Sequence, residues 1–451
     1  MGRIAVLSSP ARKPRQLVIA EAQVVDLSHE ARGVAHHEGK AIFIDDALPG
    51  ERVEWSLRKR GKSFDEGKLE RVLEASPDRV LPRCAHHGVC GGCALQHLAP
   101  LKQIEFKQRQ LTEALSRIGR VVPADVLPPL QANVWNYRRR ARLAARWVPK
   151  KNKVVVGFRE RATPYVADLQ RCEVLSEPAA SLIVPLSGLL TSLSIRDRVP
   201  QIEVAVAGTA VALVIRVLQP LTDADMTHIR EFGVQHGTQM YLQPGGYDTN
   251  APIDGQAAAE LTYALPQFDL EIAFQPTDFV QINDELNRRM VSRAVELLEP
   301  TRADDVLDLF CGLGNFSLPL ARHARHVVGV EGEAGLVARA RSNASRNGIA
   351  NAEFFTANLM DEKPIRDAWA TRRYDKVLID PPRAGAREVL PLIAASGARR
   401  LVYISCHTGS LARDAGILVH EHGFELRAAG VMDMFPHTTH VESMAVFVRE
   451  K

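Results

Sequence analysis

The sequence predicts an α/β protein whose last third folds as a doubly wound parallel sheet, preceded by a small all-β barrel and a central α+β region. The first observation is that short apolar runs alternate with helical stretches after residue 300. The second is that closely spaced apolar runs between Gly, Pro and Asp breaks fill residues 17–72. The third is the length, 451 residues, which exceeds one average domain. We expect a flexible basic tail (1–15), a β-barrel (16–75), a central α+β domain (76–270) and a carboxyl-terminal domain (271–451).

Charge is unevenly distributed along the chain. The formal net charge is only +4, yet residues 101–150 hold eleven Lys or Arg against three Asp or Glu. The excess is concentrated in Tyr137–Arg142 and Arg146. Such a cluster is typical either of a solvated face or of a surface that contacts nucleic acid.

The first 15 residues lack the long apolar segment of a secretory signal, and no apolar run reaches the ~20 residues that span a bilayer. We therefore expect a cytoplasmic protein with no membrane association. Its six cysteines should then be reduced, which favours metal binding or catalysis over disulfides.

The first predicted barrel strands lie around the apolar runs Val18-Ile19, Val24-Val25, Ala41–Ile44 and Val53–Trp55. Small barrels often present a sheet face and basic loops to nucleic acid, and Arg58–Lys62 would suit such a loop. A plain surface hairpin is the alternative.

Three cysteines follow in a glycine-containing segment, Cys84, Cys90 and Cys93, and Cys172 comes after 78 intervening residues. Glycines let the backbone wrap round a metal so that several thiolates converge. Four thiolates suit either zinc or an iron–sulfur cluster, although the five-residue gap is atypical of zinc knuckles. His86 and His87 are further candidate ligands or exposed loop residues.

The central region mixes helical and strand patterns. Residues 101–120 predict an amphipathic helix with Ile104, Leu111, Leu115 and Ile118 on its apolar face. The remaining predicted elements are strands over 154–158, 202–206 and 211–217 and helices over 176–193 and 223–236.

The last third predicts five strands in the alternating pattern, with helices between them. The strands are 306–310, 327–330, 353–355, 377–379 and 401–405, and the helices include 333–347, 387–395 and 410–421. Two final runs, 424–432 and 444–448, lack a long helix between them and predict an antiparallel pair.

Four of these strands end at residues that are suited to ligand binding or catalysis. Gly312 and Gly314 follow the first, Glu331 ends the second, Asp380 follows the fourth and Cys406 the fifth. Open α/β sheets bind ligands at this edge, and an acid at the second strand can accept hydrogen bonds from ribose hydroxyls. The glycines do not form a dinucleotide fingerprint, because Ser317 occupies the third glycine position.

A thiol beside an adenosine cofactor suggests a specific chemistry. S-adenosylmethionine offers an electrophilic methyl group, but the C5 atom of a pyrimidine is too weak a nucleophile to take it unaided. A thiolate that adds to C6 activates C5, and a base must then remove the C5 proton. Glu442, in the segment Asp433–Ser443, is the foremost candidate base. The alternatives are a buried apolar role for Cys406 and a plain surface loop for Asp433–Ser443.

At these residues the sequence resembles the RNA uracil-C5-methyltransferase family, with matches over most of residues 275–451. The matching stretches are Asp278–Asn283, Asp308–Phe316, Val330–Gly332, Asp380–Gly385, Ser405-Cys406, Leu411–Asp414 and Asp433–Ser443. The start of the chain resembles a TRAM domain, an OB-like β-barrel, at Gly33–Ala35 and Leu48–Glu51. A TRAM domain and four cysteines are together similar to the branch of the family that methylates one uracil of 23S ribosomal RNA.

The resemblance implies a Rossmann-like S-adenosylmethionine-dependent methyltransferase domain with Cys406 as nucleophile and Glu442 as proton-abstracting base. It also implies a set of residues around the cofactor, of which Gln281 and Asp380 could instead contact the uracil. It further implies a [4Fe-4S] cluster in the central domain. The cofactor residues are Gln281, Phe310, Asn315, Glu331, Asn358 and Asp380, and the cluster ligands are Cys84, Cys90, Cys93 and Cys172.

Two positions depart from the family pattern. His407-Thr408 follows the nucleophile where relatives usually have Asn-Pro, and Pro381-Pro382 follows Asp380 where many have Pro-Ala. Both put fine positioning in doubt but remove no reacting group.

We expect a monomer that grips 23S ribosomal RNA with the barrel and the 138–146 basic run and flips the target uracil into the site. The cluster is expected to be structural, because methylation moves no electrons. Two other functions remain open from the residues alone. One is a methyltransferase acting on exocyclic amino groups, which the Asp380–Pro382 segment would suit. The other is a non-catalytic RNA-binding or assembly factor.

Overall fold

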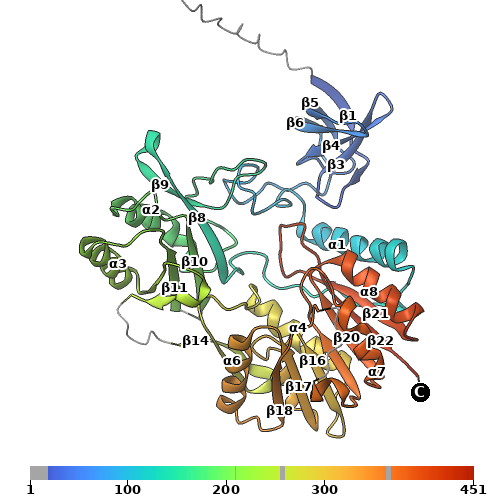
Figure 1. Cartoon of the computed structure of the whole chain (residues 1–451). Coiled ribbons are helices and arrows are strands. Elements are labelled where there is room, and N and C mark those ends of the chain that lie inside the picture. The colour runs from blue at the N-terminus through green and yellow to red at the C-terminus, as the bar shows by residue number, and fades with distance from the viewer. Residues whose placement is uncertain (1–18, 209, 254–259, 362–366, 451) are drawn as a thin grey trace, which may run out of the picture. The chain divides into compact units, whose positions relative to one another are not determined.

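The computed structural model of the chain describes residues 19–208, 210–253, 260–361 and 367–450. By its contacts the chain divides into two compact units, Met1–Val80 and Leu81–Lys451. Figure 1 shows the elements of each unit along the chain. The basic tail expected over residues 1–15 lies outside the described residues.

The first unit is one six-stranded sheet in the order β1-β5-β6-β4-β3-β2. Its neighbouring strands are antiparallel except for β4 and β6, which are parallel. Alternate side chains, among them Val24, Ile42, Ile44 and Trp55, form a separate apolar core. The strands are β1 (Ile19–Gln23), β2 (Asp26–Leu27), β3 (Gly33–His37), β4 (Lys40–Asp45), β5 (Arg52–Arg60) and β6 (Phe64–Glu74).

The second unit begins its central part with a mixed six-stranded sheet in the order β13-β12-β11-β10-β8-β9. Helices α2 (Ile183–Ser192) and α3 (Asp223–His236) pack on it through a core that includes Leu186, Ile202 and Ile229. The strands are β8 (Arg140–Val148), β9 (Lys153–Gly157), β10 (Gln201–Ala207), β11 (Ala210–Arg216), β12 (Thr238–Gln243) and β13 (Ala251–Pro252). The strands and helices expected here are confirmed, with the helical turn at Ala179–Leu182 preceding α2.

The carboxyl-terminal part of the second unit is an eight-stranded sheet in the order β18-β17-β16-β19-β20-β22-β21-β7. The first five strands are parallel, and β22 runs antiparallel to both of its neighbours. The predicted parallel sheet and the final antiparallel pair are therefore confirmed. The strands are β16 (Asp305–Leu309), β17 (His326–Glu331), β18 (Ala352–Thr356), β19 (Lys376–Ile379), β20 (Arg400–Ser405), β21 (Glu425–Met432) and β22 (Glu442–Val448).

Helices cover both faces of this sheet, as the continuous burial of its central strands requires. Along β20, Val402 and Ile404 belong to one core and Leu401 and Tyr403 to the other. One core also contains residues of α4 and α6, the other residues of α1 and α8 (Figure 1). The helices are α4 (Asp284–Leu298), α5 (Ser317–Ala321), α6 (Ala334–Arg346), α7 (Leu390–Ala395) and α8 (Thr408–His420).

Two elements from the start of the second unit also join this sheet, which the sequence did not indicate. Helix α1 (Pro100–Ala114) packs against α8 and β21, and the short strand β7 (Asp125–Val126) pairs in parallel with β21. The predicted helix over 101–120 changes to a π-helical turn at Leu115–Gly119, where Ile118 is exposed rather than buried. A hairpin of β14 (Leu261–Leu265) and β15 (Leu270–Phe274) precedes α4.

Within the described ranges, none of the helices has the length and apolar character needed to cross a membrane.

Candidate active site

The parallel register of β17, β16, β19 and β20 brings the carboxyl ends of these strands to one edge of the sheet. Gly312, Glu331, Asp380 and Cys406 stand at or just beyond those four ends. The predicted convergence of the four strand ends is therefore present in the fold. It is the edge at which open α/β sheets bind ligands.

The turn after β16 is built to leave room for a ligand. Phe310, Gly312 and Gly314 all adopt positive φ, at 64°, 54° and 89°. A Cβ atom added at Gly312 would meet nothing within 4 Å, so open space lies in front of this turn. Glu331 faces the turn, because its Oε2 accepts a hydrogen bond from the Gly312 N–H at 3.1 Å.

The Glu331 carboxylate is further fixed by its own loop. Its Oε1 accepts hydrogen bonds from the Gly332 N–H at 2.7 Å and the Glu333 N–H at 3.2 Å. Each carboxylate oxygen has two lone pairs, so Oε2, which accepts one hydrogen bond here, can still accept another from a ribose hydroxyl. An orientated acid beside an open glycine turn fits the adenosine part of S-adenosylmethionine.

Two acids, the buried Asp308 and the half-buried Asp380, lie at this edge. Burial raises the pKa of Asp308 to about 8, with a smaller contribution from the negative charge of Asp380. Asp308 accepts a hydrogen bond from the Ser317 hydroxyl, and within the described part of the chain its Oδ1 has no hydrogen-bond partner. Burial also raises the pKa of Asp380 to about 7. Both carboxyls therefore hold a proton more readily than an exposed aspartate.

Cys406 and Glu442 are brought together by the pairing of β20 with β22. Ser405 is the partner of Ser443 in this antiparallel register, so the next pair along the two strands is Cys406 and Glu442. Residues opposite each other across antiparallel strands are near neighbours. Cys406 is half-buried, whereas Glu442 is only 7% exposed.

Both groups are shifted toward their protonated forms. Burial raises the pKa of the Cys406 thiol to about 11, aided by the charges of Glu442 and Asp380. Burial also raises the pKa of Glu442 to about 8, and the charge of Asp380 adds to this, while Lys107 and Arg383 oppose it. A carboxyl that titrates near neutrality is suited to exchange a proton during a reaction.

The unusual residue after the thiol has a clear structural role. His407 is the N-cap of α8, and its Nδ1 accepts a hydrogen bond from the Ser410 N–H at 3.1 Å. An asparagine side chain serves the same capping role in many helices. This departure from the family pattern therefore preserves the start of α8 directly after Cys406.

Asp414 on α8 ties the Asp380 loop to β20. It is fully buried, and its Oδ2 accepts hydrogen bonds from the Ala386 N–H at 2.8 Å and the Tyr403 hydroxyl at 2.7 Å. The loop that carries Asp380 is thus anchored at its far end. The family resemblance included Asp414, but its partners could be found only in the fold.

The other predicted cofactor residues differ in placement. Asn315 is half-buried. Its side-chain amide donates a hydrogen bond to the Asn287 amide oxygen and accepts one from the Asn287 amide nitrogen. Its Oδ1 also accepts a hydrogen bond from the Tyr263 hydroxyl at 2.9 Å. Asn358 is exposed just after β18. Gln281 is half-buried, and its carbonyl accepts a hydrogen bond from Arg139 Nε at 2.8 Å.

Helix α1 supplies two buried side chains to the segment 433–437, which the sequence did not single out. Lys107 Nζ donates hydrogen bonds to Asp433 Oδ1 at 2.7 Å and to the Phe435 carbonyl at 2.9 Å. Gln103, one turn earlier, accepts a hydrogen bond from the His437 N–H at 2.8 Å. No sequence signal links these residues, because the partners lie more than three hundred positions apart.

The four cysteines of the predicted cluster line one cavity of about 250 Å³, together with Gln96 and Phe158. All four are free thiols. Cys90 Sγ accepts a hydrogen bond from the Gly92 N–H at 3.4 Å, and the backbone N–H groups of Val174 and Leu175 lower the pKa of Cys172 against the effect of burial. Four converging sulfurs with amide donors fit a thiolate-ligated metal centre.

The basic run after Tyr137 is not one continuous positive surface. Arg139 is buried and pairs with Asp284 at 2.6 Å. Arg140 pairs with Glu203 at 3.0 Å, and Arg142 contacts the same carboxylate at 3.1 Å. Alternation along β8 leaves Arg142 and Arg146 exposed on one face.

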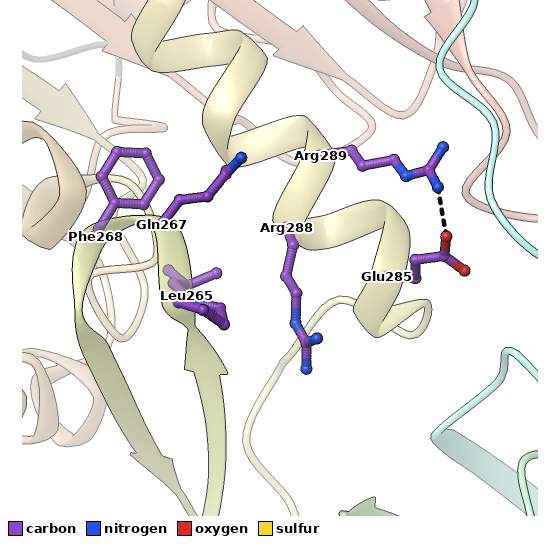
Figure 2. A pocket seen from close by; sticks show the side chains of 7 residues that line it. Leu265, Gln267, Phe268, Glu285, Arg288 and Arg289 are labelled. Carbon is purple, nitrogen blue, oxygen red and sulfur yellow. Dashed lines mark hydrogen bonds and ion pairs between the residues drawn. The ribbon is translucent and has the colours of Figure 1, made fainter.

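A further pocket of about 270 Å³ lies between the β14–β15 turn and α4 (Figure 2). Leu265 and Phe268 form its apolar side, and Arg289, which pairs with Glu285 at 2.6 Å, lies on its rim. None of the predicted catalytic, cofactor or metal residues lines it. It is therefore separate from the site at the strand ends.

The chain is similar in fold to a solved structure. The crystal structure of Pyrococcus abyssi tRNA (uracil-54, C5)-methyltransferase in complex with S-adenosyl-L-homocysteine matches with a TM-score of 0.73 and 23% identity, over 95% of this chain and 99% of that chain. This likeness over nearly the whole of both chains shows that they share a fold.

Sequence comparisons give the family. The pattern of the tRNA (Uracil-5-)-methyltransferase family matches residues 263–451. The 23S rRNA (uracil(1939)-C(5))-methyltransferase RlmD of Stenotrophomonas maltophilia is 52% identical over 95% of this chain and 96% of its own length. The enzyme of the same name from Alkalilimnicola ehrlichii is 51% identical over 95% of this chain and 96% of its own length. The chain belongs to the RNA uracil-C5-methyltransferase family.

Proposed function

We propose that this enzyme methylates C5 of one uracil in 23S ribosomal RNA, the equivalent of uracil 1939. The observation that carries the proposal is the 52% identity, over nearly the full length of both chains, to relatives named for that reaction. The neighbouring positions of Cys406 and Glu442 at the ligand-binding edge of the sheet support it.

Cys406 is the proposed nucleophile. Its sulfur gives up the thiol proton to solvent and bonds to C6 of the uracil, and the electrons of the C5–C6 double bond move toward C5 and O4. When bound, S-adenosylmethionine supplies an electrophilic methyl group, and C5 is the nucleophile that accepts it. Because burial raises the pKa of the thiol to about 11, we expect the sulfur to lose its proton only once the uracil is in place.

Glu442 is the proposed base for the final step. Its carboxylate takes the C5 proton, the C5–C6 double bond forms again, and the bond between C6 and the Cys406 sulfur breaks with its electron pair on sulfur. The pKa of Glu442, raised to about 8, lets it accept this proton and release it to solvent afterwards.

Cofactor binding is assigned to residues around the open glycine turn. Glu331 would accept hydrogen bonds from the ribose hydroxyls, with Phe310, Asn315 and Asn358 around the adenosine. Gln281 and Asp380 would lie closest to the methionine part or to the uracil. For Asn315, the amide pair with Asn287 supports a role in shaping the turn in addition to any contact with the cofactor.

The cavity lined by Cys84, Cys90, Cys93 and Cys172 would hold a [4Fe-4S] cluster of structural function. Burial raises the pKa of Cys90 to about 11 and of Cys93 to about 12, so positively charged metal ions are needed to keep these sulfurs as thiolates. The Ala94 and Leu95 N–H groups, directly after Cys93, donate to the His437 carbonyl at 2.9 Å. The cluster would thereby support the segment that leads to Glu442.

RNA binding is assigned to the first unit, as a TRAM-like barrel of residues 16–75, and to the outer face of β8. On β8, the exposed residues Arg142 and Arg146 lie beside the exposed aromatic rings of Tyr247 and Tyr165, with cation–π distances of 6.0 and 5.7 Å. Arginines interleaved with aromatic rings suit phosphates and unstacked bases. In this proposal residues 76–270 form the cluster-bearing central domain and 271–451 the catalytic domain.

The experiment that tests this function uses 23S ribosomal RNA fragments containing 5-fluorouracil. Fluorine at C5 cannot leave as a proton, so wild-type enzyme with S-adenosylmethionine should form a stable covalent complex with the RNA. Cys406→Ala should form none and transfer no methyl group, while binding S-adenosylmethionine normally. Full methyl transfer by Cys406→Ala would instead favour an exocyclic-amino methyltransferase, and absence of transfer by wild type would favour an RNA-binding factor.

A further inference from the structure

Lys107 is a lysine whose side chain is completely removed from solvent, on the face of α1 that packs against the catalytic sheet. A buried ammonium group is costly unless it is paired, and packing alone would be served as well by an apolar side chain. Lys107 meets the cost with two hydrogen bonds, to the Asp433 carboxylate and the Phe435 carbonyl. The burial of this lysine therefore indicates a role other than packing.

These two bonds hold the start of the segment that connects β21 to β22. Asp433 directly follows Met432, and Met432 is the strand partner of Glu442. Gln103 holds the middle of the same segment through the His437 N–H at 2.8 Å. Helix α1 thus fixes the chain on the approach to Glu442 at two points.

Charged groups from several elements surround Glu442. Asp380 and Arg383 come from the end of β19, Cys406 from the end of β20, and Lys107 from α1. Asp433 is only 2% exposed and is paired with Lys107. Burial and Asp380 raise the pKa of Glu442, whereas Lys107 and Arg383 lower it. Of these two cations, Lys107 is the one whose side chain is fully buried.

We propose that Lys107 is a positioning residue for the proton-removal step: it fixes the Asp433–Phe435 segment and supplies the buried positive charge that keeps Glu442 available as a carboxylate. This inference rests on the proposed role of Glu442 as base. Because the Lys107 side chain has no exposed surface, it should contact neither the uracil nor the methyl group. It should therefore affect elimination of the thiol and not methyl transfer to C5.

The test follows two signals after a single turnover on ordinary, unfluorinated RNA, across pH ~6 to ~10. One is methyl transfer, and the other is the fraction of enzyme still covalently joined to RNA. In Lys107→Met, loss of the cation should move the pH midpoint of elimination upward by about one unit, which corresponds to about tenfold slower elimination below that midpoint. The methylated covalent complex should accumulate.

Two further variants separate charge from folding. Lys107→Met leaves Asp433 buried without its partner, so the double variant Lys107→Met/Asp433→Asn removes both charges and should restore the melting temperature. It should retain the upward shift of the pH midpoint, because the cation is still absent. Lys102→Met, on the same helix, removes a lysine whose pair with Glu105 is partly exposed, and it should behave as wild type.

Glu442→Gln is measured in parallel. If it traps the covalent complex while the double variant eliminates the thiol with the wild-type pH profile, the role of Lys107 is refuted and the proposed function stands. If Glu442→Gln turns over at the wild-type rate, the base itself is assigned wrongly. Slow elimination with an unshifted pH midpoint in the double variant would also overturn the charge role of Lys107.

Discussion

Ser405 on β20 and Ser443 on β22 are direct partners across two antiparallel strands, and this single pairing sets Cys406 beside Glu442. The two proposed reacting groups come from strand ends separated by 36 positions in the chain, yet they need no flexible loop to meet. A site built on strand ends is more rigid than one built on loops, which suits a thiol and a base that must act on adjacent carbons.

Acids with raised pKa values make stability depend on pH in a defined direction. Asp308 and Glu442 have pKa values raised to about 8, and Asp380 to about 7, whereas in the unfolded chain they titrate near 4. Between those limits the folded state binds more protons than the unfolded state, so the free energy of unfolding should fall as pH rises from about 4 to 8. Asp308→Asn should flatten this fall, as measured by urea denaturation at several pH values. An unchanged pH dependence would mean that Asp308 is ionised in the folded protein.

Loss of the Glu331 carboxylate should weaken cofactor binding. Glu331→Ala removes the acceptor of the Gly312 N–H, which is also the proposed acceptor for the ribose, so affinity for S-adenosylmethionine should fall about tenfold to a hundredfold, or roughly 1.5–3 kcal/mol. Isothermal titration calorimetry measures this directly. Glu333→Ala is the matched control, because that neighbouring side chain is 67% exposed. Equal effects of the two changes would contradict the assignment.

The four-cysteine cavity predicts its metal content. Anaerobically purified protein should hold about four iron atoms per chain, and Cys84→Ser or Cys172→Ser should reduce that content strongly. Iron and sulfide analysis with visible absorption measures the result. Cys406→Ser should retain the full content, since Cys406 lies at the strand ends and not among the residues that line this cavity. Zinc in place of iron and sulfide would refute the cluster but keep the ligand set.

Arg142 and Arg146 should contribute to RNA affinity by neutralising phosphates. Replacing each by Ala should weaken binding of the RNA fragment and reduce the slope of log affinity against log salt by roughly 0.7 for each phosphate that is no longer neutralised. Fluorescence anisotropy at several salt concentrations gives the slope. Arg325→Ala removes an exposed arginine just before β17, at the amino ends of the strands of the catalytic sheet and away from the proposed active site. It should leave the slope unchanged. A similar decrease in all three variants would indicate only a general charge effect.

The sequence predicted the catalytic sheet well because its strands are buried on both faces and therefore appear as short continuous apolar runs. Strand ends then located Glu331, Asp380 and Cys406 without any alignment. The sequence could not predict β7, because a two-residue edge strand has no periodicity to detect. The burial of Arg139 was also hidden, since its partner Asp284 lies 145 positions away and charge counting treats all arginines as exposed. Lys107 was missed for the same reason, as its partner lies 326 positions away.

Strand β7 and helix α1 have a practical consequence for anyone who wishes to isolate the catalytic part. A chain trimmed to the family match at residue 263 would lose both, leaving the backbone of β21 unpaired along one side and the apolar surface under α1 uncovered. Uncapped sheet edges readily recruit other chains. Such a fragment should aggregate, and the smallest soluble methyltransferase should begin near residue 81, ahead of the cysteines, rather than at the recognisable family boundary.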